Sequence, residues 1–157
     1  MKEIDKWLVI IASLIATSLS ANNQLVNLAL DLEQAKSLKV PIMLVFVDDD
    51  CEDCEKINEE IIKPMKISGD YNDKVIIRII NIDEDKIIDF DGVVSEVENI
   101  ANRYNLELTP TVSFVDDSAR KISPSISGMS NLDYYGSLLD ESINNALKKM
   151  RIRGQEK

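Results

Sequence analysis

Apolar runs alternate with helical patterns along this chain, and this alternation constrains its fold more than any other feature. Residues 42–47 form a continuous apolar run, as expected of a strand covered on both faces. Residues 75–80 form a second, β-branched run. Between them, apolar side chains recur with a helical period from residue 57 to residue 65. Strands joined in this way predict a parallel pair with helices on both faces of the sheet.

The remaining elements complete an α-β-α-β-α-β-β-α order. Further helices are expected over residues 22–39, 95–104 and 131–149, and further strands over residues 111–115 and near 121–126. Asn23 and Asn131 are candidate N-caps, and residues 95–98 match a capping box. Residues 83–92 are expected to form an acidic loop. We therefore predict an α/β fold of three layers, in which a central mixed sheet of about four strands lies between helices.

The only two cysteines, Cys51 and Cys54, lie directly after the first predicted strand, where a helical pattern opens. Two intervening residues allow both sulfurs to meet at the first turn of a helix and to close a reversible disulfide. The carboxyl ends of parallel strands are also where such sheets bind substrates. A redox site is the favoured interpretation. A static disulfide and a metal site completed by carboxylates remain alternatives.

Charge and composition exclude several classes of function. The formal net charge is -10, which argues against nucleic acid or an anionic membrane surface as a partner. The chain contains no histidine, so imidazole acid–base chemistry and the commonest neutral metal ligand are absent. Its length of 157 residues suggests one domain whose hydrophobic core is large enough to be stable without disulfide or metal cross-links.

The first 21 residues differ from the rest. A short polar start precedes an apolar stretch at residues 7–19, followed by small residues suited to cleavage. This stretch is shorter than the roughly 20 apolar residues that span a membrane. We predict a signal peptide over residues 1–21, a domain over residues 22–150 and a charged tail over residues 151–157. An uncleaved N-terminal anchor is the alternative. Export to a bacterial periplasm would expose the cysteine pair to redox exchange.

A resemblance emerges when the cysteine pair is combined with Thr109-Pro110-Thr111, which precedes the third strand. The chain resembles the thioredoxin superfamily over about residues 28–147. More narrowly, it resembles exported thioredoxin-related proteins of the SoxW type. This resemblance implies that Pro110 is cis and lies against the cysteines, and that the Thr109 backbone pairs with an extended substrate chain.

The chain also departs from thioredoxin itself. Val45 stands where thioredoxin has a buried carboxylate that assists proton transfer, and Asp50 stands where thioredoxin has tryptophan. The residues between the cysteines are Glu52 and Asp53 rather than Gly-Pro. These differences argue against a housekeeping thioredoxin.

We therefore predict a thiol-disulfide oxidoreductase in which Cys51 is the nucleophile and Cys54 the resolving thiol. Asp50, Glu52 and Asp53 should disfavour a thiolate, so that the Cys51 pKa stays nearer to that of a free thiol and the couple is reducing. The expected partners are periplasmic proteins that carry disulfides or sulfur adducts, together with a membrane electron donor. A monomer without cofactor or metal is expected.

Other functions of the same fold remain open. An oxidase or isomerase would use the same cysteines. A metal carrier or adaptor would use the fold without redox turnover. The resemblance suggests a link to sulfur oxidation or to cytochrome maturation, without selecting between them.

Overall fold

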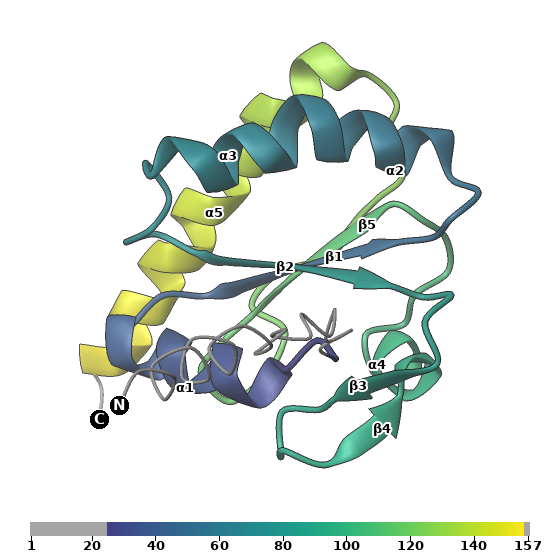
Figure 1. Ribbon diagram of the computed structural model, residues 1–157. Helices are drawn as coiled ribbons and strands as arrows, with labels where there is room; N and C mark the ends of the chain where they lie inside the picture. The colour runs from purple at the N-terminus through teal and green to yellow at the C-terminus, as the bar shows by residue number, and fades with distance from the viewer. Residues whose placement is uncertain (1–24, 156–157) are drawn as a thin grey trace, which may run out of the picture.

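The computed structural model describes residues 25–155 and contains a four-stranded mixed sheet (Figure 1). Its spatial order is β2-β1-β5-β6. Strand β1 (Ile42–Val47) pairs parallel with β2 (Ile76–Asn81) and antiparallel with β5 (Thr111–Val115). Strand β6 (Ile126–Ser127) pairs antiparallel with β5 and lies at the end of the segment near residues 121–126 where a fourth strand was predicted. The predicted mixed sheet is therefore confirmed.

Helices cover both faces of this sheet, as predicted (Figure 1). Helices α1 (Leu28–Leu38) and α4 (Val97–Arg103) contribute to one core cluster. The segments after the cysteines and most of the buried face of α5 (Leu132–Gln155) contribute to the other. Strand β1 supplies both clusters, because its side chains alternate: Ile42, Leu44 and Phe46 join the first, whereas Met43 and Val45 join the second.

The helix that follows the cysteines is interrupted. It consists of α2 (Glu52–Ile57), a π-helical turn η1 (Asn58–Ile62) and α3 (Lys63–Ser68). Pro64 lies in the first turn of α3, where a missing N–H is tolerated, and the Lys63 N–H donates to the Asn58 carbonyl. The sequence predicted that the helix ends or kinks at Pro64. In the structure the α-helix is interrupted just before Pro64, by the π-helical turn η1.

Two local predictions in the segment before α4 need correction. Residues 83–92 were expected to be only an acidic loop, but the region contains a hairpin of β3 (Lys86–Ile88) and β4 (Val94–Glu96). Strands this short give too few alternations for a period to be recognised. The capping box at residues 95–98 is wrong, because Ser95 belongs to β4 and α4 begins only after Glu96, whose side chain makes no cap.

The N-terminal caps of α1 and α5 can be compared with the predicted ones. The first helix begins at Leu28 rather than at residue 22, with the Asn27 side chain accepting from the Leu30 N–H at 3.1 Å. The cap predicted from the sequence, Asn23, lies outside the described residues, and Asn27 caps α1 in its place. The cap predicted for α5 is confirmed, since Asn131 accepts from the Tyr134 N–H at 3.2 Å.

The predicted signal peptide, residues 1–21, lies outside the described residues. Within residues 25–155, no helix combines the length and the apolar character needed to cross a membrane. The domain boundaries proposed from the sequence stay predictions.

An ion pair between a buried carboxylate and an exposed guanidinium ties the hairpin turn to α4. The Asp89 carboxylate accepts from Arg103 Nη1 at 2.8 Å and Nη2 at 2.6 Å, and from the Phe90 N–H at 2.6 Å. Burial by itself raises the pKa of Asp89, but the hydrogen bonds from Arg103 and Phe90 outweigh it, so that the pKa lies below its ordinary value. The charged form of Asp89 is therefore the one that the fold binds.

We expect Asp89→Asn to lower the free energy of unfolding at pH 7 by about 1–3 kcal/mol, measured by urea denaturation. Because the pKa is lower in the folded state, the contribution of Asp89 is present above its unfolded pKa and is lost as pH falls through the folded value. The gap between the two proteins should therefore close below about pH 4. Asp85→Asn, which changes an exposed carboxylate beside the same hairpin, is the control. A gap that stays constant down to pH 2 would contradict this interpretation.

Candidate active site

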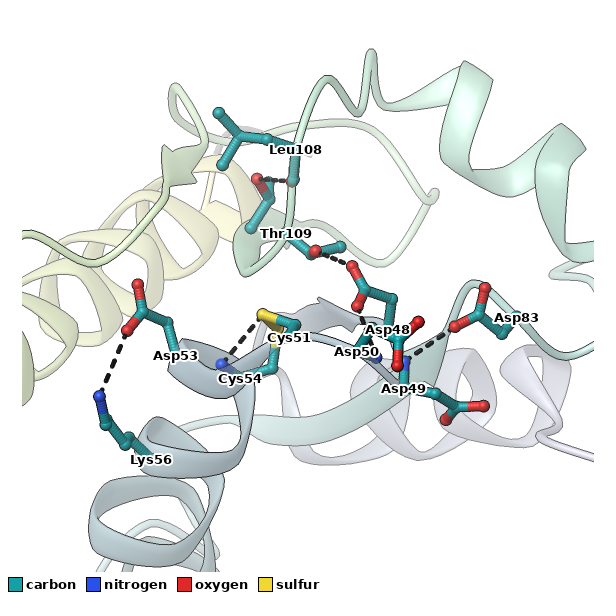
Figure 2. The surroundings of a disulfide bond; sticks show 11 residues. Asp48, Asp49, Asp50, Cys51, Asp53, Cys54, Lys56, Asp83, Leu108 and Thr109 are labelled. Atoms are coloured by element: carbon teal, nitrogen blue, oxygen red, sulfur yellow. Dashed lines mark hydrogen bonds and ion pairs between the residues drawn. A yellow bond between two sulfur atoms is a disulfide. The ribbon is translucent and has the colours of Figure 1, made fainter.

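The two cysteines lie at the carboxyl end of β1 and the start of α2, and they form a disulfide in this structure (Figure 2). The Sγ atoms are 2.04 Å apart and the Cα atoms 5.1 Å apart. Cys51 is the N-cap of α2, with an extended backbone, and its sulfur accepts from the Cys54 N–H at 3.1 Å. The expected meeting of the two sulfurs at the first turn of a helix is therefore what the structure shows.

The two sulfurs differ in access. Cys51 is partly exposed, whereas Cys54 is only 3% exposed and packs inside the first turn. A thiolate that approaches the disulfide from solvent can therefore reach Cys51 more readily than Cys54. In the reduced form, the same difference makes Cys51 the sulfur that an incoming disulfide can meet.

The loop before β5 lies beside the cysteines. The Thr109–Pro110 peptide bond is cis in this structure. The Thr109 hydroxyl donates to the Asp48 carboxylate, as Figure 2 shows, and Asp48 lies just before the cysteine pair. The structure thus brings Thr109 and the cysteine loop together, although 61 positions separate Thr109 from Asp48 in the sequence.

Internal hydrogen bonds hold this loop and leave one backbone position free. The Thr111 hydroxyl donates to the Leu108 carbonyl at 2.7 Å, and the Gly128 N–H donates to the Pro110 carbonyl at 2.7 Å. Within the described part of the chain, no hydrogen bond engages the backbone N–H or carbonyl of Thr109. These two groups could pair with an extended chain laid beside the disulfide.

A second set of contacts anchors a different acidic segment, residues 48–50 before the cysteines and called the acidic loop from here on, to the end of β2. The Asp49 N–H donates to the Asp83 carboxylate at 2.8 Å, and the Asn81 amide donates to the Asp49 carboxylate at 2.6 Å. The Asp50 N–H donates to the Asp48 carboxylate at 3.1 Å. Sequence reasoning treated these acids only as charges. The predicted parallel pairing could have indicated these contacts. The carboxyl ends of parallel strands meet at one edge of a sheet, which brings residues 48–50 close to residues 81–83.

The disulfide lines a groove of about 610 Å³. Both cysteines and the carboxylate-bearing residues 48–50, Glu52 and Glu55 contribute to its wall. Within residues 25–155, no group of three or more His, Cys, Asp or Glu side chains is arranged to hold a metal ion. The groove therefore offers an incoming molecule a disulfide with a strongly acidic border.

Lys56 offsets part of this negative charge. Its ammonium lies 2.7 Å from the Glu52 carboxylate and 3.9 Å from that of Asp53. The hydrogen bond from Lys56 lowers the pKa of Glu52, and the same bond raises the pKa of Lys56. Sequence reasoning missed this countercharge, although its spacing from Glu52 is that of a helical ion pair. Among the three acids singled out beside the cysteines, only Asp50 has no ion pair in the described residues.

Val45, at the position where thioredoxin has a buried carboxylate, is 1% exposed and packs in the core cluster that includes Ile57 of α2. Strand β1 therefore supplies no buried acid beneath the cysteine pair. Any proton transfer that involves Cys54 must use another group or solvent.

Solved structures share this fold at low sequence identity. A protein named DsbH oxidoreductase matches with a TM-score of 0.55 and 19% identity, covering 82% of this chain and 86% of that one. A thioredoxin of Fasciola hepatica matches with a TM-score of 0.51 and 21% identity, over 78% and 99% of the two chains. A thioredoxin h of poplar matches with a TM-score of 0.51 and 16% identity, over 73% and 86%. At these identities the likeness concerns the fold.

No curated protein matches this chain. The model of the thioredoxin-like domain, in contrast, matches residues 28–143. This match includes both cysteines, the Thr109–Pro110 loop and all four strands of the main sheet. The chain therefore belongs to the thioredoxin-like domain family.

Proposed function

We propose that this protein is a thiol-disulfide oxidoreductase that acts through Cys51 and Cys54 and works as a reductant of protein disulfides or sulfur adducts. The observation that carries the proposal is the disulfide between a partly exposed Cys51 and a buried Cys54 at the start of α2. Membership of the thioredoxin-like domain family supports it.

The reaction begins with the reduced pair. The Cys51 thiolate attacks one sulfur of a substrate disulfide, and a mixed disulfide forms while one substrate thiolate leaves. The Cys54 thiolate then attacks the Cys51 sulfur, which releases the second substrate thiol and closes the Cys51–Cys54 disulfide. Two electrons pass to the substrate, and a dithiol donor must supply two electrons to restore the reduced pair.

Thr109 and Pro110 are proposed to guide the substrate. The free backbone groups of Thr109 would hydrogen-bond to an extended segment that carries the target sulfur, in the manner of an added strand. Pro110 is buried at the base of this loop, where its carbonyl is already bonded to Gly128. The substrate segment would then lie across the exposed side of Cys51.

Two electrostatic effects oppose each other at Cys51. The N-terminus of a helix favours a thiolate by roughly 0.3–1 kcal/mol. The acidic residues of the groove disfavour it, and Asp50, Glu52 and Asp53 are the proposed tuning residues. Because strong oxidants depend on a stabilised thiolate, we propose that this couple is more reducing than they are.

We propose an exported protein of the SoxW type, which works as a monomer in the periplasm and is re-reduced by a membrane electron donor. Its partners would be periplasmic proteins with a basic rim around the target sulfur, because the groove is bordered by carboxylates. The protein itself would be linked to sulfur oxidation or to cytochrome maturation.

The first prediction concerns the nucleophile. Native protein should accelerate insulin reduction by dithiothreitol, and Cys51→Ser should reduce this acceleration to background. Cys54→Ser should instead accumulate covalent adducts with partners, since the resolving thiol is missing. Ser137→Ala, a change on the exposed face of α5, is the control. Equal activity in native protein and Cys51→Ser would reject the proposed mechanism, and metal found with the purified protein would favour a carrier.

The second prediction concerns the redox potential. A titration against glutathione or dithiothreitol buffers should place the couple well below the value of about -120 mV found for the strongest periplasmic oxidant. Removing negative charge with Asp50→Asn should raise the potential, because the thiolate of the reduced form is then less disfavoured. A native potential near -120 mV would favour an oxidase instead.

The third prediction concerns partner charge. The double variant Asp50→Asn/Glu52→Gln should lower the ratio of the rate with a cationic peptide disulfide to the rate with a neutral peptide disulfide about three- to tenfold at low ionic strength, since this ratio cancels any change in thiolate reactivity. This difference should fade at high salt, because screening weakens exposed charges. Glu33→Gln/Glu98→Gln makes the same change in net charge on the opposite face of the sheet and serves as the control. A loss that is equal in both double variants would contradict a local effect of the groove.

A further inference from the structure

Within residues 25–155, the Asp48 carboxylate makes the one side-chain hydrogen bond between the acidic loop before the cysteines and residues 108–110, here called the proline loop. It accepts from the Thr109 hydroxyl on one side and from the Asp50 N–H at 3.1 Å on the other. Asp48 is half-buried and lines the same groove as the disulfide. Figure 2 shows its carboxylate directed toward Thr109, between the proline loop and the acidic loop.

This contact differs in kind from the other anchors of the acidic loop. Asp49 bonds to Asn81 and Asp83, and these contacts hold the loop against the end of β2, away from Thr109. Within the described residues, no other side-chain hydrogen bond joins residues 48–55 to residues 108–110. The relative position of the two loops therefore depends on Asp48 more than on any neighbouring acid.

The hydrogen bond to Asp48 also restrains the backbone of Thr109, which is the proposed binding site for the substrate chain. With its hydroxyl directed to Asp48, Thr109 is restrained in orientation, while its backbone N–H and carbonyl have no hydrogen-bond partner among residues 25–155. A hydrogen bond to a charged acceptor is stronger than a neutral one, so this restraint is a firm one. Restraint before binding lowers the entropy lost when a substrate chain docks.

We infer that Asp48 is a positioning residue, which holds the backbone of Thr109 in register with the attacking Cys51 sulfur and thereby favours extended peptide substrates over small disulfides. The inference rests on the proposed function. Asp48 does not itself touch the reacting sulfurs in this role. Its effect reaches the substrate through Thr109.

The experiment uses a Cys54→Ser parent, in which Cys51 is the only thiol. Its rate constants are measured with a small neutral disulfide, 2,2′-dithiodipyridine, and with an uncharged extended peptide whose cysteine carries the same thiopyridyl group. The ratio of the peptide rate to the small-disulfide rate is the readout. Because both reagents meet the same thiolate and release the same leaving group, a changed thiolate reactivity largely cancels in this ratio.

Asp48→Ala and Thr109→Val should each lower the ratio roughly tenfold, since either change removes the hydrogen bond between the loops. The double variant should be no worse than either single variant, because the two changes remove one shared interaction. Asp48→Asn retains an acceptor oxygen and should keep most of the ratio, as should Thr109→Ser, which retains the hydroxyl. Glu55→Gln removes a carboxylate from the same groove without contact to Thr109 and should leave the ratio within about twofold.

The outcomes separate the two proposals. A parent that reacts with neither disulfide would overturn the proposed function and this inference with it. A parent that reacts with both, with a ratio that Asp48→Ala and Thr109→Val leave unchanged, would overturn the positioning role alone. Losses that add in the double variant would also overturn it. If Asp48→Ala does not fold, the pair Thr109→Val and Thr109→Ser tests the same hydrogen bond with the carboxylate in place.

Discussion

The double-sided burial of β1 is the constraint on which the rest of the structure depends. Residues 42–46 are almost fully excluded from solvent, with alternate side chains in the two core clusters. Because β1 is parallel to β2 and antiparallel to β5, the end of β1, the end of β2 and the start of β5 meet at one edge of the sheet. The cysteines follow β1, Asn81 is the last residue of β2, and Thr109 precedes β5. The strand register therefore brings the segments of the site together at this edge, and the side-chain hydrogen bonds add to that arrangement.

The acidic loop shows how a concentration of like charges can be accommodated beside a reactive sulfur. Asp48 and Asp49 do not simply repel each other, since each carboxylate accepts a hydrogen bond from another segment of the chain. Hydrogen bonds to ionised acceptors are strong, so these acids stabilise the loop geometry despite their mutual repulsion. Lys56 pairs with Glu52 on the first turn of α2. The remaining negative charge borders the groove, where it can act on a partner.

Ion pairs between buried carboxylates and arginines stabilise the periphery of the fold. Three carboxylates with little solvent exposure, those of Asp31, Asp89 and Asp116, each pair with arginine. The Arg78 guanidinium meets Asp31 through two bonds, at 2.5 and 2.6 Å, and its pKa is raised mainly by that hydrogen bonding. In each pair the arginine is more exposed than its partner, so that the buried charge is compensated from the surface. These pairs explain how polar residues can occupy positions beside the core.

The sequence by itself determined the strands at residues 42–47 and 111–115, the helix start at Cys51 and the layer order. These features depend on apolar periodicity and on local capping, which a sequence displays directly. Only the tertiary structure decided that Asp48 meets Thr109, that Asn81 and Asp83 hold Asp49, and that β3 and β4 form a hairpin. Such contacts depend on register and on distances between segments far apart in the chain. A local pattern of residues carries no information about those distances.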